Sequence, residues 1–169
     1  EQGLAQNTIG AFLQDRQGFL WIGTESGLQK YDGYEFLDYA QLDDSTDGAL
    51  ERPISALAED ADGTLWVGSV GAGLLRKHAA SERFDRVDIG PDTGSVSALL
   101  ADPERGIWVA TTGRILLLDA NSGALRHTYP FANAAELPAT RQIERDDDGA
   151  LWIAGSQGIW RLAPGADAP

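Results

Sequence analysis

Residues 54–76 read ISALAEDADGTLWVGSVGAGLLR, and this stretch decides the fold of the chain. It alternates short runs rich in apolar and β-branched residues with turns rich in Asp and Gly, and no window has a sustained helical period. With the residues that follow, it predicts strands at 54–59, 64–69, 74–77 and 84–88. Four short strands joined by tight turns predict one antiparallel sheet.

The same pattern occurs four times along the chain. Its tryptophans stand 45, 42 and 44 residues apart, each with an Asp six residues before it and an aliphatic residue on either side. The pairs are Asp15 and Trp21, Asp60 and Trp66, Asp102 and Trp108, and Asp146 and Trp152. Repeats of this length, with four strands and one Trp each, are typical of β-propeller blades. The sequence therefore predicts an all-β chain of propeller blades.

The predicted blades are four-stranded antiparallel sheets in a single, partial propeller domain over residues 1–169. They span approximately residues 9–45, 54–90, 96–132 and 139–163, and the fourth lacks its outer strand. Residues 1–8 leave open whether a closing strand comes from the N-terminus. Because the residues around each Trp are apolar without alternation, both faces of that strand are expected to be covered by neighbouring blades. A Gly or Ala follows two residues after each Trp, and we expect it to let the next sheet approach.

Composition excludes several classes of function. The 169 residues carry a net charge of -13, which would repel a phosphate backbone and anionic membrane surfaces. No nucleic-acid partner is therefore expected. No stretch approaches the roughly 20 apolar residues of a membrane span, so no membrane insertion by this segment is expected. Cysteine is absent, which excludes disulfides and thiolate metal sites. The chain starts at Glu1 and contains no Met, and we expect a piece of a longer protein.

Three stretches of the chain resemble a known repeat. Residues 3–36 (GLAQNTIGAFLQDRQGFLWIGTESGLQKYDGYEF), 54–76 and 151–162 (LWIAGSQGIWRL) are similar to the two-component regulator propeller repeat. The resemblance implies a periplasmic sensor region of an inner-membrane protein, with a hybrid histidine kinase or diguanylate cyclase as output. It also implies that four copies are only part of a larger propeller array.

The Asp-containing turns raise the question of cation binding. Residues 146–149 (DDDG) look most like a cation loop, but the matching turn of the first repeat carries the positive charge of Arg16. We therefore expect each Asp carboxylate to bond backbone N–H groups two residues on. His78 and His127 occupy different positions in their repeats and have no evident third ligand. The sequence predicts no metal and no cofactor.

Binding residues are expected on one face of the propeller, where loops between blades and the hairpins between second and third strands meet. These hairpins are predicted to start at Thr24, Ser69, Thr111 and Ser156. Candidate ligand-binding residues on this face are Thr24, Glu25, Arg52, Arg114, Arg141 and Gln157. Trp160 lies outside the repeated Trp position and is either a core residue or an exposed aromatic at a contact.

The sequence favours a non-enzymatic sensor segment that binds a small molecule or oligosaccharide. One alternative is a fragment of a propeller enzyme, such as a lyase or glycosidase, which a cluster of His and carboxylates at a channel mouth would favour. Another is a scaffold propeller that only mediates dimerisation. Four blades of a larger ring leave two open apolar faces, and such faces drive association. We expect a homodimer, or closure of the four blades into a compact ring.

Overall fold

The computed structural model describes residues 7–39, 46–91, 94–130 and 140–165. These residues form an all-β structure of four separate antiparallel sheets, which confirms the predicted fold class. The first sheet holds β1 (Ile9–Gln14), β2 (Leu20–Thr24), β3 (Gly27–Tyr31) and β4 (Phe36–Asp38), and the second holds β5 (Ile54–Glu59), β6 (Leu65–Ser69), β7 (Gly73–Lys77) and β8 (Asp85–Val87). The third holds β9 (Val96–Asp102), β10 (Gly106–Thr111), β11 (Arg114–Leu118) and β12 (Leu125–Pro130), and the fourth holds β13 (Thr140–Arg145), β14 (Leu151–Gly155) and β15 (Gly158–Leu162).

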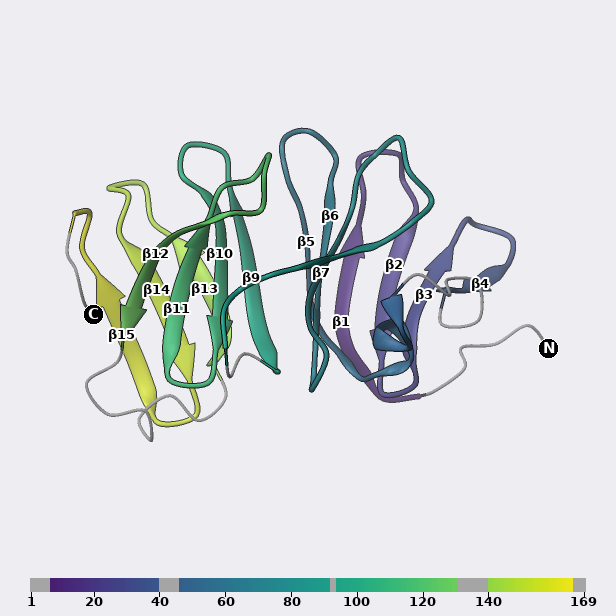
Figure 1. The fold of residues 1–169 in the computed structure, drawn as a ribbon, viewed down its shortest axis with the longest axis horizontal. Helices are drawn as coiled ribbons and strands as arrows, with labels where there is room; N and C mark the ends of the chain where they lie inside the picture. The colour runs from purple at the N-terminus through teal and green to yellow at the C-terminus, as the bar shows by residue number, and fades with distance from the viewer. Residues whose placement is uncertain (1–6, 40–45, 92–93, 131–139, 166–169) are drawn as a thin grey trace.

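The sheets stand face to face in chain order. Figure 1 shows the first sheet at the right and the fourth at the left, so the first and last blades lie at opposite ends of the row. The first strands β1, β5, β9 and β13 contact one another in succession, so they form a common inner edge. A short 3-10 helix at Ala49–Glu51 precedes β5. Each sheet is one blade, and the fourth has three strands, as the sequence predicts.

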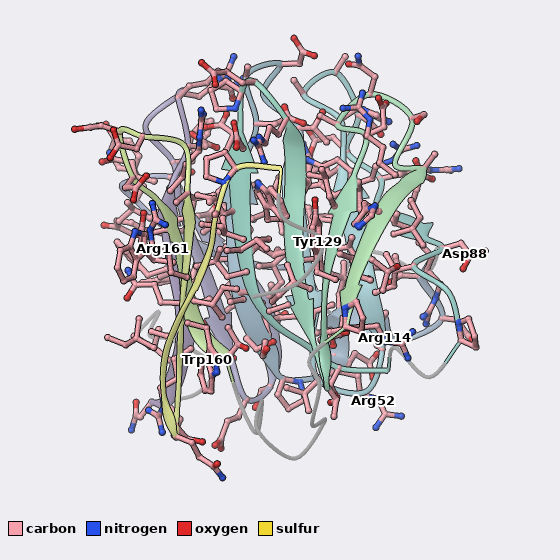
Figure 2. The ribbon with its side chains drawn as sticks, turned by 90° about the vertical axis from the view of Figure 1, so that its left-hand side faces the viewer. Arg52, Asp88, Arg114, Tyr129, Trp160 and Arg161 are labelled. Atoms are coloured by element: carbon pink, nitrogen blue, oxygen red, sulfur yellow. The ribbon has the colours of Figure 1, made fainter. Side chains whose placement is uncertain are left out.

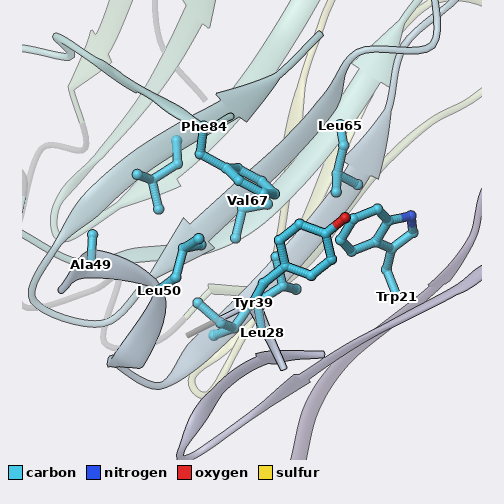
Figure 3. Packing of buried hydrophobic residues seen from close by; sticks show 10 residues of the cluster. Trp21, Leu28, Tyr39, Ala49, Leu50, Leu65, Val67 and Phe84 are labelled. Carbon is cyan, nitrogen blue, oxygen red and sulfur yellow. The ribbon is translucent and has the colours of Figure 1, made fainter. Parts of the chain in front are cut away.

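Three of the four repeated tryptophans, Trp21, Trp66 and Trp108, fill the space between consecutive blades. Trp21 in the first blade packs among Tyr39 and Phe84, with ring centroids 5.1 and 6.3 Å away (Figure 3). Trp66 and Trp108 are 0% and 1% exposed, and each packs against the following blade. Three apolar clusters, one per junction, hold the four blades together.

The small residue after each Trp sets how closely the blades approach. A Cβ at Gly23 would lie 2.6 Å from Cγ2 of Ile54, the first residue of the next blade. A Cβ at Gly68 would lie 2.6 Å from Cγ1 of Val96. Real Cβ atoms do not approach so closely, because van der Waals contact between carbons lies near 3.5–4.0 Å. Glycine at these two positions is therefore required by the packing of neighbouring blades.

The repeated Asp joins the turn to the tryptophan. In all four blades the indole Nε1 donates to Oδ2 of the Asp six residues earlier, over 2.8, 2.9, 3.3 and 2.7 Å in chain order. In the first three blades Oδ1 also accepts the backbone N–H two residues on, as the sequence predicts. The turn chemistry and the core packing thus depend on one carboxylate per blade.

The ends of strands and blades differ in part from the sequence-based prediction. The predicted hairpin start at Ser156 is wrong by one residue: Gly155 pairs with Gly158, in the position that Thr24 holds in the first blade. The strand of the fourth blade therefore ends before Ser156, which lies in the turn. The sequence left open whether residues 1–8 supply a closing strand, and these residues lie largely outside the described part of the chain. The predicted blade ends at 40–45 and 131–132 also lie outside it.

Candidate binding site at the inner edge

Every first strand carries a β-bulge at its second residue. Pairing with the second strand skips one residue in each blade: Gly10, Ser55, Ser97 and Arg141. A bulge leaves the extra residue out of the hydrogen-bond ladder and re-aims its side chain. Four equivalent bulges, one per blade, therefore place four residues in one row along the inner edge.

The row lines one pocket. Its cavity volume is about 580 Å³, within the range of small-molecule sites. We call it the inner-edge pocket, and its lining residues are Gly10, Ser55, Val70, Ser95, Val96, Ser97, Thr111, Thr112, Thr140 and Arg141. All four blades contribute to it. Six of the ten lining residues carry a hydroxyl group, one carries a positive charge, and none carries a carboxylate.

The hydroxyl groups of the two bulge serines, Ser55 and Ser97, donate hydrogen bonds to backbone carbonyl oxygens. Ser55 Oγ lies within hydrogen-bond distance of the carbonyl of Gly68 in its own blade, at 3.2 Å, and of Val96 in the next. Ser97 Oγ donates to the carbonyl of Ala110 over 3.4 Å. Because a hydroxyl has one proton and two lone pairs, what these oxygens can still offer a ligand is acceptor capacity.

The first blade has glycine, Gly10, at the bulge because the backbone of the second blade approaches closely there. A Cβ at Gly10 would stand 2.4 Å from the carbonyl oxygen of Ile54. The bulge of the first blade therefore has no room for a side chain, whereas Ser55 occupies the corresponding place with a hydroxyl that reaches the next blade. The bulge position thus has no side chain in the first blade, where it is Gly10, and a long, positively charged side chain in the fourth, where it is Arg141.

The six predicted binding residues do not converge. Only Arg141 lines the inner-edge pocket. Thr24 is 1% exposed and fixes its hairpin, because its Oγ1 donates to Gly27 over 3.1 Å and accepts from the N–H of Ser26. Figure 2 shows Arg52 and Arg114 at the lower end of the molecule, and Arg114 donates to the carbonyl of Pro91 over 3.3 Å. Glu25, Arg52 and Gln157 are exposed and do not line the inner-edge pocket.

Sequence reasoning selected one lining residue of the pocket, Arg141, but missed the other nine. Ser55, Ser97 and Thr140 lie at strand positions, where a polar residue is expected to be merely solvated. A signal was present: aligning the four repeats on their tryptophans and inner strands places Gly10, Ser55, Ser97 and Arg141 in one column. No local pattern identifies that column as a bulge.

Other candidate chemistry lies away from the pocket. His78 Nδ1 is 3.4 Å from Thr64 Oγ1, and the His127 ring stands 4.3 Å from that of Tyr129. Among the described residues, no group of three or more His, Cys, Asp or Glu side chains could hold a metal ion. Trp160 is partly buried and packs with the cluster between the third and fourth blades, which matches its interpretation as a core residue (Figure 2).

The two end blades each present an open face. Trp152, the fourth member of the Trp series, is 41% exposed, and Ile159 beside it on the same face is 70% exposed. At the other end, Ile9 and Phe12 of β1 are 49% and 60% exposed. In the single chain the four blades are thus an open arc, not the compact closed ring that was one of our two expectations.

Comparison with known proteins indicates the class of protein to which this fold belongs. The fold is that of a β-propeller segment, and residues 3–26 and 48–71 match the family model for the two component regulator propeller. These two segments match the two component regulator propeller, which confirms the resemblance predicted from the sequence. No curated protein matches the chain.

Solved structures with the same fold include extracellular domains of two-component and one-component systems and an enzyme. The extracellular domain of a B. thetaiotaomicron protein described as a hybrid two component system is 26% identical, with a TM-score of 0.73 over 98% of this chain and 26% of that one. A second B. thetaiotaomicron extracellular domain, described as a one component system, is 20% identical, with a TM-score of 0.74 over 97% of this chain and 21% of that one. Virginiamycin B lyase from Staphylococcus aureus is 19% identical, with a TM-score of 0.75 over 98% of this chain and 56% of that one.

This chain thus spans about a quarter of each extracellular domain and about half of the lyase. In the described part of the chain, no helix is long and apolar enough to cross a membrane.

Proposed function

We propose that this chain is a non-catalytic, ligand-binding segment of an extracytoplasmic sensor, and that it binds a small molecule in the inner-edge pocket. One observation carries the proposal: bulges at the same position of four blades bring their residues into one pocket. The matches to the regulator propeller family and the similarity to the extracellular domain of a hybrid two component system support the sensor role.

The lining of the pocket favours binding over lyase or glycosidase chemistry. General acid–base catalysis needs a titratable side chain within hydrogen-bond reach of the reacting group. The described residues that line the pocket include no histidine and no carboxylate. Hydroxyls and one guanidinium can hold and orient a ligand, and this is what a sensor requires.

The cellular context and the partners belong to the same proposal. We place the segment in the periplasm, as part of an inner-membrane protein whose output domain is a kinase or a diguanylate cyclase. We also propose that the two open end faces pair between two copies. The support is that Ile9 of the first blade occupies the position at which Ile54 and Val96 pack against the preceding blade.

A blocking variant tests the proposed function. Thr112 is exposed, lines the pocket and lies at the tip of its hairpin, so Thr112→Trp should fill the pocket without disturbing the core. Glu25 occupies the equivalent hairpin position of the first blade but lies outside the pocket lining, so Glu25→Trp is the matched control. Thermal-shift screening of a library of saccharides and small metabolites should give hits for wild type and Glu25→Trp that Thr112→Trp loses. Hits retained by Thr112→Trp would contradict a site in this pocket.

A further inference from the structure

We infer that the inner-edge pocket selects a hydroxylated carboxylate, with Arg141 binding the carboxylate and the serines of the bulge row accepting from the ligand hydroxyls. This inference rests on the proposed function and adds the chemical class of the ligand. It comes from the types of polar group that the four bulges bring together. Each requirement on the ligand follows from a separate observation.

The carboxylate is required by Arg141. Its side chain is exposed at the bulge of β13 and lines the pocket, and no described residue forms an ion pair or side-chain hydrogen bond with it. Other arginines of the chain are engaged: Arg16 pairs with Glu59 over 3.0 Å, and Arg145 with Asp102 over 3.1 Å. A guanidinium presents a planar fork of donors that matches a carboxylate in two parallel hydrogen bonds.

The surrounding charge makes this assignment selective. The chain carries 26 acidic residues against 13 basic ones, so its overall field repels anions. Among the described residues, no carboxylate lines the inner-edge pocket. An anion that enters therefore meets, at short range, a guanidinium that no described side chain pairs, and a direct hydrogen bond there outweighs the screened long-range repulsion.

The hydroxyl groups of the ligand are required by the serines. Ser55 and Ser97 already donate to carbonyl oxygens of the blades, so their free lone pairs call for donors on the ligand. A carboxylate ion has no proton to donate, and it cannot satisfy these oxygens. A molecule with hydroxyls along its length and a carboxylate at one end meets both demands across the width of the pocket.

Gluconate and sorbitol form a matched pair of probes. They share a six-carbon hydroxylated chain, and only gluconate carries a carboxylate. Arg141→Gln removes the proposed contact, Arg141→Lys keeps the charge but loses the fork, and Arg52→Gln removes one charge from an exposed arginine that does not line the pocket. Binding is measured by titration of ¹⁵N-labelled protein, and the dispersion of the amide spectrum verifies the fold of each variant.

Gluconate should shift the amides of Ser55, Ser97 and Thr112 and bind at least about tenfold more tightly than sorbitol. Arg141→Gln should remove that advantage, Arg141→Lys should restore part of it, and Arg52→Gln should leave it unchanged. Equal binding of both probes, or no effect of Arg141→Gln, would overturn the inference while leaving the pocket as a binding site. Gluconate shifts confined to other parts of the molecule would also overturn it.

Discussion

The indole nitrogen of Trp66 donates a hydrogen bond of 2.9 Å to Oδ2 of Asp60, and the other oxygen of that carboxylate accepts the backbone N–H groups of Asp62 and Thr64. One side chain thus fixes both the turn between the first two strands and the ring that fills the junction to the next blade. This explains why the spacing of six residues recurs in all four repeats.

Removing Asp60 should therefore destabilise the fold strongly. Asp60→Ala leaves a buried indole N–H and two turn N–H groups without their acceptor, and we expect a loss of about 2–4 kcal/mol in the free energy of unfolding. Urea denaturation followed by Trp fluorescence measures it. Asp146→Ala is the internal comparison, since Trp152 is 41% exposed and water can replace the lost acceptor. An equal loss in both variants would contradict this account.

The buried ring of Trp66 and the half-exposed ring of Trp152 should also contribute differently to stability. Trp66 is 0% exposed, and Trp66→Ala should cost about 3–5 kcal/mol because it leaves a cavity between the second and third blades. Trp152→Ala should cost clearly less in the isolated chain, because its ring already faces solvent on one side. Differential scanning calorimetry at low protein concentration separates the two. A Trp152→Ala loss as large as that of Trp66→Ala would mean that another surface covers this ring.

Pairing of the open end faces predicts a specific solution mass. If two copies pair, light scattering after size exclusion should give about 36 kDa, twice the 18.1 kDa of one chain. Ile159→Glu places a charge on the open face of the fourth blade and should return the mass to that of the monomer. Tyr34→Glu alters an exposed residue of the β3–β4 turn, away from either face, and should leave the dimer intact. A wild-type monomer at high concentration would refute the pairing.

Stability should fall in acid through Asp119. Hydrogen bonds from the backbone and the hydroxyl of Ser122, with a further contribution from Arg126, lower the pKa of the Asp119 carboxyl from 3.8 to about 2. A carboxyl whose pKa is lowered by folding stabilises the protein above the unfolded-state pKa, and this contribution is lost as the pH falls toward 2. Urea midpoints of wild type and Asp119→Asn should differ at pH 5 and converge between pH 4 and about pH 2. A constant difference over that range would contradict the assignment.

The blades could be predicted from the sequence because the same Asp–Trp hydrogen bond, at the same spacing, recurs in each of them. Asp60, Trp66 and Gly68 have fixed roles in a turn, a junction and a close approach, so their spacing carries the architecture. The pocket could not be predicted in the same way. A bulge adds a residue to a strand without altering its composition, so Ser55 and Ser97 read as ordinary strand residues.

Arg141 was selected for a different reason. It was selected from its expected place in an inter-blade loop, and the same reasoning selected Arg52, which does not line the pocket. Arg114 was selected from a hairpin and does not line the pocket either. Position on a face can be predicted from the order of strands. Convergence of side chains requires the register of all four inner strands, and that register is a property of the assembled blades.

The most direct test of the central claim is a crystal structure of this segment with the tightest-binding compound from the thermal-shift screen. The account predicts that the compound lies at the inner edge, in contact with Ser55, Ser97 and Arg141. A compound bound instead among the Asp-containing turns at the other end of the blades, or on the open face at Trp152, would contradict it.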